Sequence, residues 1–124
     1  MTEKEVLMPV QFETPVLPMR DSEIVSVYVT NIQITPARAR QLVGIHTGNT
    51  IGDLVAGDTP SELVIADNRA YWRVPVLLFG GLRGRIGQIG YVDVDSETGA
   101  LKLTDALQRK LEEDALRLAA SAAL

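Results

Sequence analysis

The chain of 124 residues contains no cysteine. This absence excludes disulfide bonds, thiolate nucleophiles and zinc sites built from cysteine, and it fits a reducing compartment. Aromatic residues make up only 5% of the chain, so its core must consist of aliphatic side chains. No apolar run approaches the about 20 residues that span a bilayer, and the first residues lack the pattern of a signal peptide. We therefore expect a cytoplasmic protein that does not interact with membranes.

Charge and length narrow the class further. The chain has 16 acidic and 12 basic residues, for a formal net charge of −4, which disfavours a generic binder of nucleic acid or of a membrane surface. The length fits one domain with a modest core. We expect a single α+β domain over residues 21–124, preceded by an arm over residues 1–20.

The arm combines prolines with apolar side chains. Pro9, Pro15 and Pro18 prevent a regular helix. A disordered tail usually lacks apolar residues because it cannot bury them, so we expect the arm to pack against its own domain or against another chain; the alternative is a flexible tail without a function. The candidate partner-binding residues are Val6, Leu7, Met8, Phe12, Val16, Leu17 and Met19.

The pattern of apolar residues predicts an antiparallel sheet with helices. Thr35 followed by Pro36, and Thr104 followed by Asp105, are typical of helix starts, and alternating apolar residues indicate strands. Consecutive hairpins favour an α+β fold: an antiparallel β-sheet of about four to five strands, with a short helix and a C-terminal amphipathic helix packed on one face. The expected strands are 22–30, 61–66, 70–79, 86–94 and 100–103. The first expected helix begins at Pro36, with Gly48 and Asn49 as its stop signal, and the second spans 105–122.

Two details of this prediction concern irregular positions. Residues 50–60 contain two glycines and a proline and are expected to be mostly loop. Pro75 cannot donate to a β-ladder, so strand 70–79 either lies at an edge of the sheet or turns residue 75 away from its neighbour. Trp72 and the alternate residues that follow it are expected to face the core.

The glycine-rich stretch LFGGLRGRIGQIGYVDVDSETG, residues 78–99, raises the question of a phosphate site. A dinucleotide fingerprint is followed by a helix, and a P-loop needs G-K-[ST]; here a strand follows and that motif is absent. The glycines therefore indicate turns, and Gly87 and Gly90 indicate a bulge or a close approach of the backbone. A bulge would also reconcile Ile86 and Ile89 with Val92 and Val94, which strict alternation does not place all on one face.

The acidic residues and the single histidine give no catalytic or metal site. Asp93, Asp95 and Glu97 lack the glycine and the final glutamate that a calcium loop needs at fixed positions, so we expect a solvated turn. His46 stands alone near the end of the first helix, without a nucleophile motif or a second metal ligand. We expect no cofactor, no metal and no enzymatic activity.

One local charge feature remains. No acid occurs between Asp67 and Asp93, whereas four arginines do. On one face of the sheet they would form a basic patch for a phosphate backbone or an acidic surface; the alternative is a solvated face with scattered charges. The residues of this candidate patch are Arg69, Arg73, Arg83 and Arg85.

Short motifs carry a resemblance over residues 60–104. W-x-V-P-V, then G-x-x-G-x-[IV]-G, then a strand ending in D-x-x-T-G resembles PepSY-like domains and small uncharacterised bacterial proteins with the same elements. The resemblance implies a helix packed on an antiparallel sheet and a role in binding or modulation. It assigns no functional residue, because the shared positions form strands and turns.

Two functions follow as hypotheses. The first is a non-enzymatic protein-interaction or assembly module, oligomeric or part of a complex, because the apolar arm, the alanine-rich C-terminus and an edge strand open to pairing are typical of such proteins. The alternative is a nucleic-acid-associated regulator or antitoxin-like protein that uses the arginines. A small ligand between sheet and helix also remains open.

Overall fold

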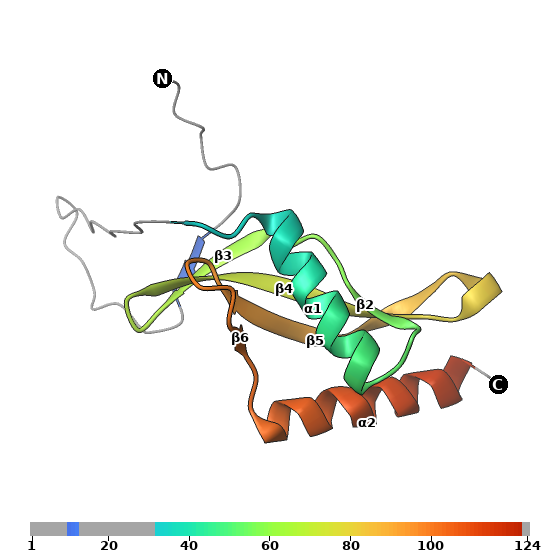
Figure 1. Cartoon of the computed structure of the whole chain (residues 1–124). Coiled ribbons are helices and arrows are strands. Elements are labelled where there is room, and N and C mark those ends of the chain that lie inside the picture. The colour runs from blue at the N-terminus through green and yellow to red at the C-terminus, as the bar shows by residue number, and fades with distance from the viewer. Residues whose placement is uncertain (1–9, 13–31, 123–124) are drawn as a thin grey trace, which may run out of the picture.

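The computed structural model describes residues 10–12 and 32–122 (Figure 1). The expected strand 22–30 lies outside the described residues, whereas the expected C-terminal helix lies within them. The elements are β1 (Val10–Phe12), α1 (Pro36–Thr50), β2 (Val55–Gly57), β3 (Glu62–Ala66), β4 (Arg69–Phe79), η1 (Gly81–Arg83), β5 (Arg85–Asp95), β6 (Leu101–Lys102) and α2 (Asp105–Ala122).

The strands form one sheet in the order β1-β3-β4-β5-β6, and β2 pairs with β4 beyond the end of β3. Strands β2 to β6 pair in antiparallel fashion, whereas β1 joins β3 in parallel. The predicted α+β class is therefore confirmed, including the C-terminal helix that packs against the sheet. Among the described residues, neither helix is long and apolar enough to cross a membrane.

Both helices contribute to a single core on one face of the sheet. On β4, alternate residues point into it, with Val74 and Val76 at 0% exposure, as the sequence pattern predicts. Both helices begin as predicted, because Thr35 Oγ1 accepts a hydrogen bond from the Arg38 amide and Thr104 Oγ1 accepts one from the Leu107 amide. The buried residues of the helices in this core are Ala39 and Val43 on α1 and Leu111 and Ala115 on α2.

Pro75 does not mark an edge strand. β4 lies inside the sheet, with β5 on one side and β3 and β2 on the other. The carbonyl of Pro75 accepts a hydrogen bond from the Asp58 amide at 2.8 Å, so the proline nitrogen faces the same side. There β3 pairing has ended at Arg73 and β2 pairing begins at Val76. The missing N–H therefore falls in the gap between two strands and costs no ladder bond.

The segment 50–60, which is expected to be mostly loop, holds the strand β2. β2 pairs with residues 76–78 of β4 and buries Val55 at 5% exposure. On its outer side, the Val55 carbonyl accepts from Thr47 Oγ1 at 3.3 Å and the Gly57 carbonyl from Arg40 Nε at 3.2 Å. Side chains of α1 thus take the place of a neighbouring strand.

The predicted irregularity of the glycine-rich strand is confirmed. The β4–β5 ladder shifts register twice, so that Ile86 and Ile89 are extra residues on β5. The extra residue brings Ile89, at 7% exposure, into the same core as Val92. Gly90 has a φ of +154°, and a Cβ there would lie 2.8 Å from Leu111 Cδ2. The glycine therefore lets α2 approach the sheet closely.

Candidate functional site

A groove opens between the end of α1, the loop before β2 and the C-terminal half of α2. Its volume is about 610 Å³, larger than two other hollows of about 380 and 330 Å³ in the described part of the chain. Volumes of this size suit the binding of a few apolar side chains or a small ligand. The groove is lined by residues 50–55, Leu78, Glu112, Ala115, Leu116 and Ala119.

The groove has a buried apolar floor and exposed apolar rims. Val55, Leu78 and Ala115 form the floor and are 5–6% exposed. Leu54 on one rim is 50% exposed, and Leu116 on the other is 73% exposed. Single exposed leucines are common on proteins, but two that flank one hollow with an apolar floor form a continuous surface that a partner can cover.

The charged groups of the groove are all acidic. Asp53 and Glu112 are its only ionisable lining residues. Glu112 Oε2 accepts a hydrogen bond from Gln108 Nε2 at 2.8 Å, which orients that carboxylate, whereas Asp53 forms no hydrogen bond or ion pair within the described residues. Both carboxylates can therefore attract a cation at the rim.

The end of α1 adds to this negative potential. α1 ends at Thr50 on the wall of the groove, and its last turn contains no basic residue. Carbonyl groups at the C-terminal end of a helix carry partial negative charge, which favours cations. The groove thus combines an apolar floor with three sources of negative charge.

The predicted partner-binding residues lie almost wholly in a part of the chain that the structure does not describe. Phe12 belongs to β1, where its backbone is in register with Ile65 of β3. Strand β1 therefore occupies this edge of the sheet. The other predicted residues of the arm, which lie outside the described residues, are Val6, Leu7, Met8, Val16, Leu17 and Met19.

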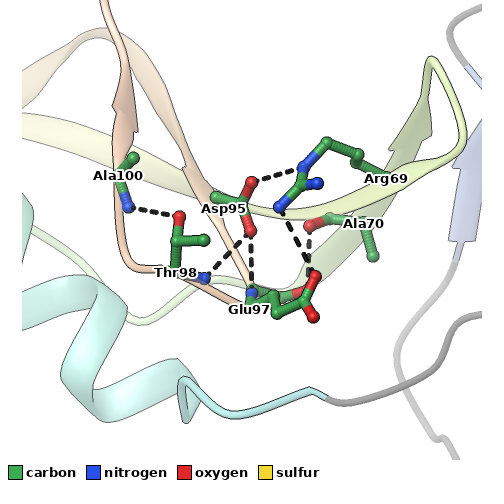
Figure 2. A network of polar contacts seen from close by, with 7 residues as sticks. Arg69, Ala70, Asp95, Glu97, Thr98 and Ala100 are labelled. Atoms are coloured by element: carbon green, nitrogen blue, oxygen red, sulfur yellow. Dashed lines mark hydrogen bonds and ion pairs between the residues drawn. The ribbon is translucent and has the colours of Figure 1, made fainter.

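Of the four predicted basic residues, Arg69 is held by acids at the turn after β5 (Figure 2). Its Nε donates to Asp95 Oδ2 at 2.7 Å, and its Nη2 lies 3.4 Å from Glu97 Oε1. Asp95 Oδ1 accepts in addition from the amides of Glu97 and Thr98. The Arg69 hydrogen bond, assisted by these amides and opposed by burial, lowers the pKa of Asp95 below its ordinary value.

Arg73 is neutralised in the same way. Its Nε and Nη2 donate to the two carboxylate oxygens of Asp93 at 2.9 Å each, and its guanidinium lies 4.1 Å from the ring centroid of Tyr91. Both side chains of the ion pair are largely buried, at 13% and 10% exposure. The prediction of a solvated acidic turn is therefore wrong for Asp93 and Asp95, which are buried and paired with arginines.

The remaining two arginines lie at the other end of the same hairpin. Arg83 in η1 donates to the carbonyl of Ala122. Arg85 begins β5, and its side chain forms no hydrogen bond or ion pair with the described residues. The structure thus separates the four arginines into a neutralised pair and a pair at the hairpin tip.

His46 belongs to a small polar network between the helices. Its Nε2 lies 2.8 Å from Gln108 Oε1, and Gln108 Nε2 donates to Thr50 Oγ1 at 3.0 Å. This contact joins α1 to α2 beside the groove. Within residues 10–12 and 32–122, no group of three or more potential ligands could hold a metal ion.

Sequence reasoning missed the groove. Leu54 lies in a segment expected to be mostly loop, and Leu116 lies away from the face of α2 that buries Leu111 and Ala115. The available signal was a leucine on the polar side of an amphipathic helix, at the position that follows the buried Ala115. Its partner across the groove could not be identified without the tertiary structure.

Comparison of the chain with models of protein families, with curated proteins and with solved structures finds no match. The resemblance to PepSY-like domains stays a prediction.

Proposed function

We propose that this protein is a non-enzymatic protein-interaction module that binds a partner through the groove between the α1–β2 loop and α2. The observation that carries the proposal is the pair of exposed leucines, Leu54 and Leu116, above an apolar floor. Fully burying a leucine contributes about 1.5–3 kcal/mol. Leu54 and Leu116 are already partly buried, so a partner that covers both rims gains part of this free energy at each leucine, and partner side chains that fill the groove add to it.

The N-terminal arm supports the same class of function. β1 shows that part of the arm adds a short strand to the sheet edge, and strand addition is one of the recurrent ways in which proteins bind one another. We therefore extend the proposal to assembly: the arm contributes either to the stability of its own domain or to self-association.

The nucleic-acid alternative receives less support. Two of its four arginines, Arg69 and Arg73, have their charge balanced by the buried carboxylates of Asp95 and Asp93. A phosphate would have to compete with those carboxylates, at the cost of leaving a buried acid unpaired. Arg83 and Arg85 alone make a weak site for a polyanion.

A comparative pull-down tests the proposal. Tagged wild-type protein and two variants, Leu116→Asp and Leu82→Asp, are expressed in the source cells and recovered after nuclease treatment, and bound proteins are quantified by mass spectrometry. Leu82 is the matched control, because it is fully exposed in η1 and lies outside the groove. Thermal unfolding of each variant verifies that the fold is intact.

We expect a stoichiometric partner with the wild type and with Leu82→Asp, and its loss with Leu116→Asp. A partner retained by Leu116→Asp would contradict the groove as the binding site. Material lost on nuclease treatment would instead favour the nucleic-acid alternative. Removal of residues 1–20, followed by light scattering, tests the assembly role of the arm: an unchanged assembly state and fold would exclude it.

A further inference from the structure

We propose that the occupant of the groove is an amphipathic helix of a partner protein that carries lysine or arginine beside its apolar face. This inference rests on the proposed function and specifies its partner. It follows from three properties of the groove. The outer edge of β2 beside it is already hydrogen-bonded, its charged lining residues Asp53 and Glu112 are acidic, and it lies between a helix and a loop.

The strand nearest the groove cannot accept another strand. β2 is an edge strand, but the carbonyls of Val55 and Gly57 on its outer side already accept hydrogen bonds from Thr47 and Arg40. Strand addition depends on free main-chain groups along an edge. An extended peptide would have to displace these side chains, so recognition must come from side chains that enter the groove.

Side-chain recognition in an apolar groove is typical of a bound helix. A helix presents residues at i, i+3 or i+4 and i+7 on one face, and these anchors can fill a hollow between two walls. The walls here are α2, with Leu116 and Ala119, and the loop with Leu54. The groove volume of about 610 Å³ accommodates a few such anchors.

The acids determine the charge of that helix. Asp53 and Glu112 lie in the groove together with the carbonyl end of α1, and no basic residue lines it. A lysine or arginine that flanks the apolar anchors would meet this negative potential, whereas an acidic helix would be repelled. The negative charge thus selects among amphipathic helices.

The same acids argue against a second copy of this chain as the occupant. A two-fold interface places the same surface on both partners. Groove-to-groove contact would therefore bring a second Asp53 and a second Glu112 into the interface, without a basic residue of the groove to balance them. A basic partner of a different sequence resolves this conflict.

A peptide selection tests the inference. A display library of helix-forming peptides with randomised positions is selected on the full-length wild-type protein and, in parallel, on Leu116→Asp and Leu82→Asp. Sequencing compares the lysine and arginine content of the enriched peptides with that of the unselected library. Dissociation constants of the most enriched peptides are then measured by fluorescence polarisation at low and high salt.

Charge variants test the acidic rim separately from the apolar rim. The double variant Asp53→Asn with Glu112→Gln removes both charges. It keeps a side-chain oxygen at position 112 that can accept the hydrogen bond from Gln108 Nε2. Glu113→Gln is the matched control, because Glu113 is an exposed neighbour on α2 outside the groove. Exposed ion pairs contribute about 0.2–1 kcal/mol each, so the double variant should weaken binding about fivefold at low salt, with Glu113→Gln unchanged.

The inference predicts basic, amphipathic peptides whose binding is weakened at least about tenfold by Leu116→Asp and is left intact by Leu82→Asp. Leu116-dependent peptides without an excess of lysine and arginine would overturn the basic helix while leaving the interaction module standing. The absence of any Leu116-dependent peptide would overturn the helix-in-groove inference, and the pull-down would still decide the proposed function independently.

Discussion

Replacement of Gly90 by alanine tests how α2 is seated on the sheet. The new Cβ would lie 2.8 Å from Leu111 Cδ2, in a core where Leu111 is 1% exposed. The φ of +154° is also one that residues with a side chain rarely adopt. Backbone strain of this kind costs about 1–3 kcal/mol, and overpacking costs about 1–3 kcal/mol more. The variant should therefore lose between about 2 and about 6 kcal/mol of unfolding free energy.

Two other glycines separate these contributions. Gly81 has a φ of +62° and no heavy atom within 4 Å of an added Cβ, so Gly81→Ala measures backbone strain alone. Gly48 lies inside α1 with the same open space and no positive φ, so Gly48→Ala should stabilise the protein by about 0.5–1 kcal/mol.

Urea unfolding, followed by the fluorescence of the single tryptophan Trp72 and by circular dichroism, gives the free energy of each variant. Gly90→Ala should be the most destabilised of the three. If Gly90→Ala loses no more free energy than Gly81→Ala, then α2 does not pack closely on β5 at this residue.

Three further perturbations concern buried polar contacts. Because the pKa of Asp95 is lowered in the folded state, ionised Asp95 contributes fully to the free energy of unfolding above its ordinary pKa of about 3.8, and this contribution is lost as the pH falls below that value. Asp95→Asn should therefore flatten the acid side of the stability–pH curve. An unchanged curve would show that the contact between Arg69 and Asp95 does not cause the loss of stability in acid. Arg73→Met should cost about 3–5 kcal/mol because it leaves Asp93 buried without its partner, and Arg73→Met with Asp93→Leu should recover part of that loss in urea unfolding. Trp72→Phe removes a 2.7 Å hydrogen bond from the indole to the backbone carbonyl of Ile34 and should lower the free energy of unfolding by about 1–3 kcal/mol. A loss below about 1 kcal/mol in calorimetry would contradict this bond.

Local signals in the sequence were sufficient for most of the described fold. Threonine caps fixed the starts of both helices, because Thr35 and Thr104 have side-chain oxygens where the first amides need acceptors. Alternation identified β4 and its core face, and the mismatch between Ile89 and Val92 revealed a bulge. Each of these signals can be read within a short stretch of the sequence.

The charged pairs could not be predicted, because they depend on register. Phe79 pairs with Arg85 at the hairpin tip, and a regular ladder from there would place Arg73 opposite Tyr91. The two extra residues of β5 shift the register so that Arg73 meets Asp93 instead. A sequence can suggest that a bulge exists, but its exact position decides which charges face each other.

The short strand β2 and the groove were missed for a related reason. The alternating pattern around Val55 is too short to indicate a strand. Val55 is buried by β4 and α1, which are distant from it in the sequence. Leu54 and Leu116 are 62 positions apart in the sequence. Only the tertiary arrangement brings them to opposite rims of one groove.

Photo-crosslinking in the source cells identifies what covers the groove between the α1–β2 loop and α2. A benzophenone amino acid is placed at Leu116 in one sample and at Leu82 in another, and crosslinked peptides are identified by mass spectrometry. We expect position 116 to capture one protein through a helical segment with lysine or arginine beside apolar residues, and position 82 not to capture it. The same adducts at both positions, or none at position 116, would contradict the proposal that this groove binds a partner.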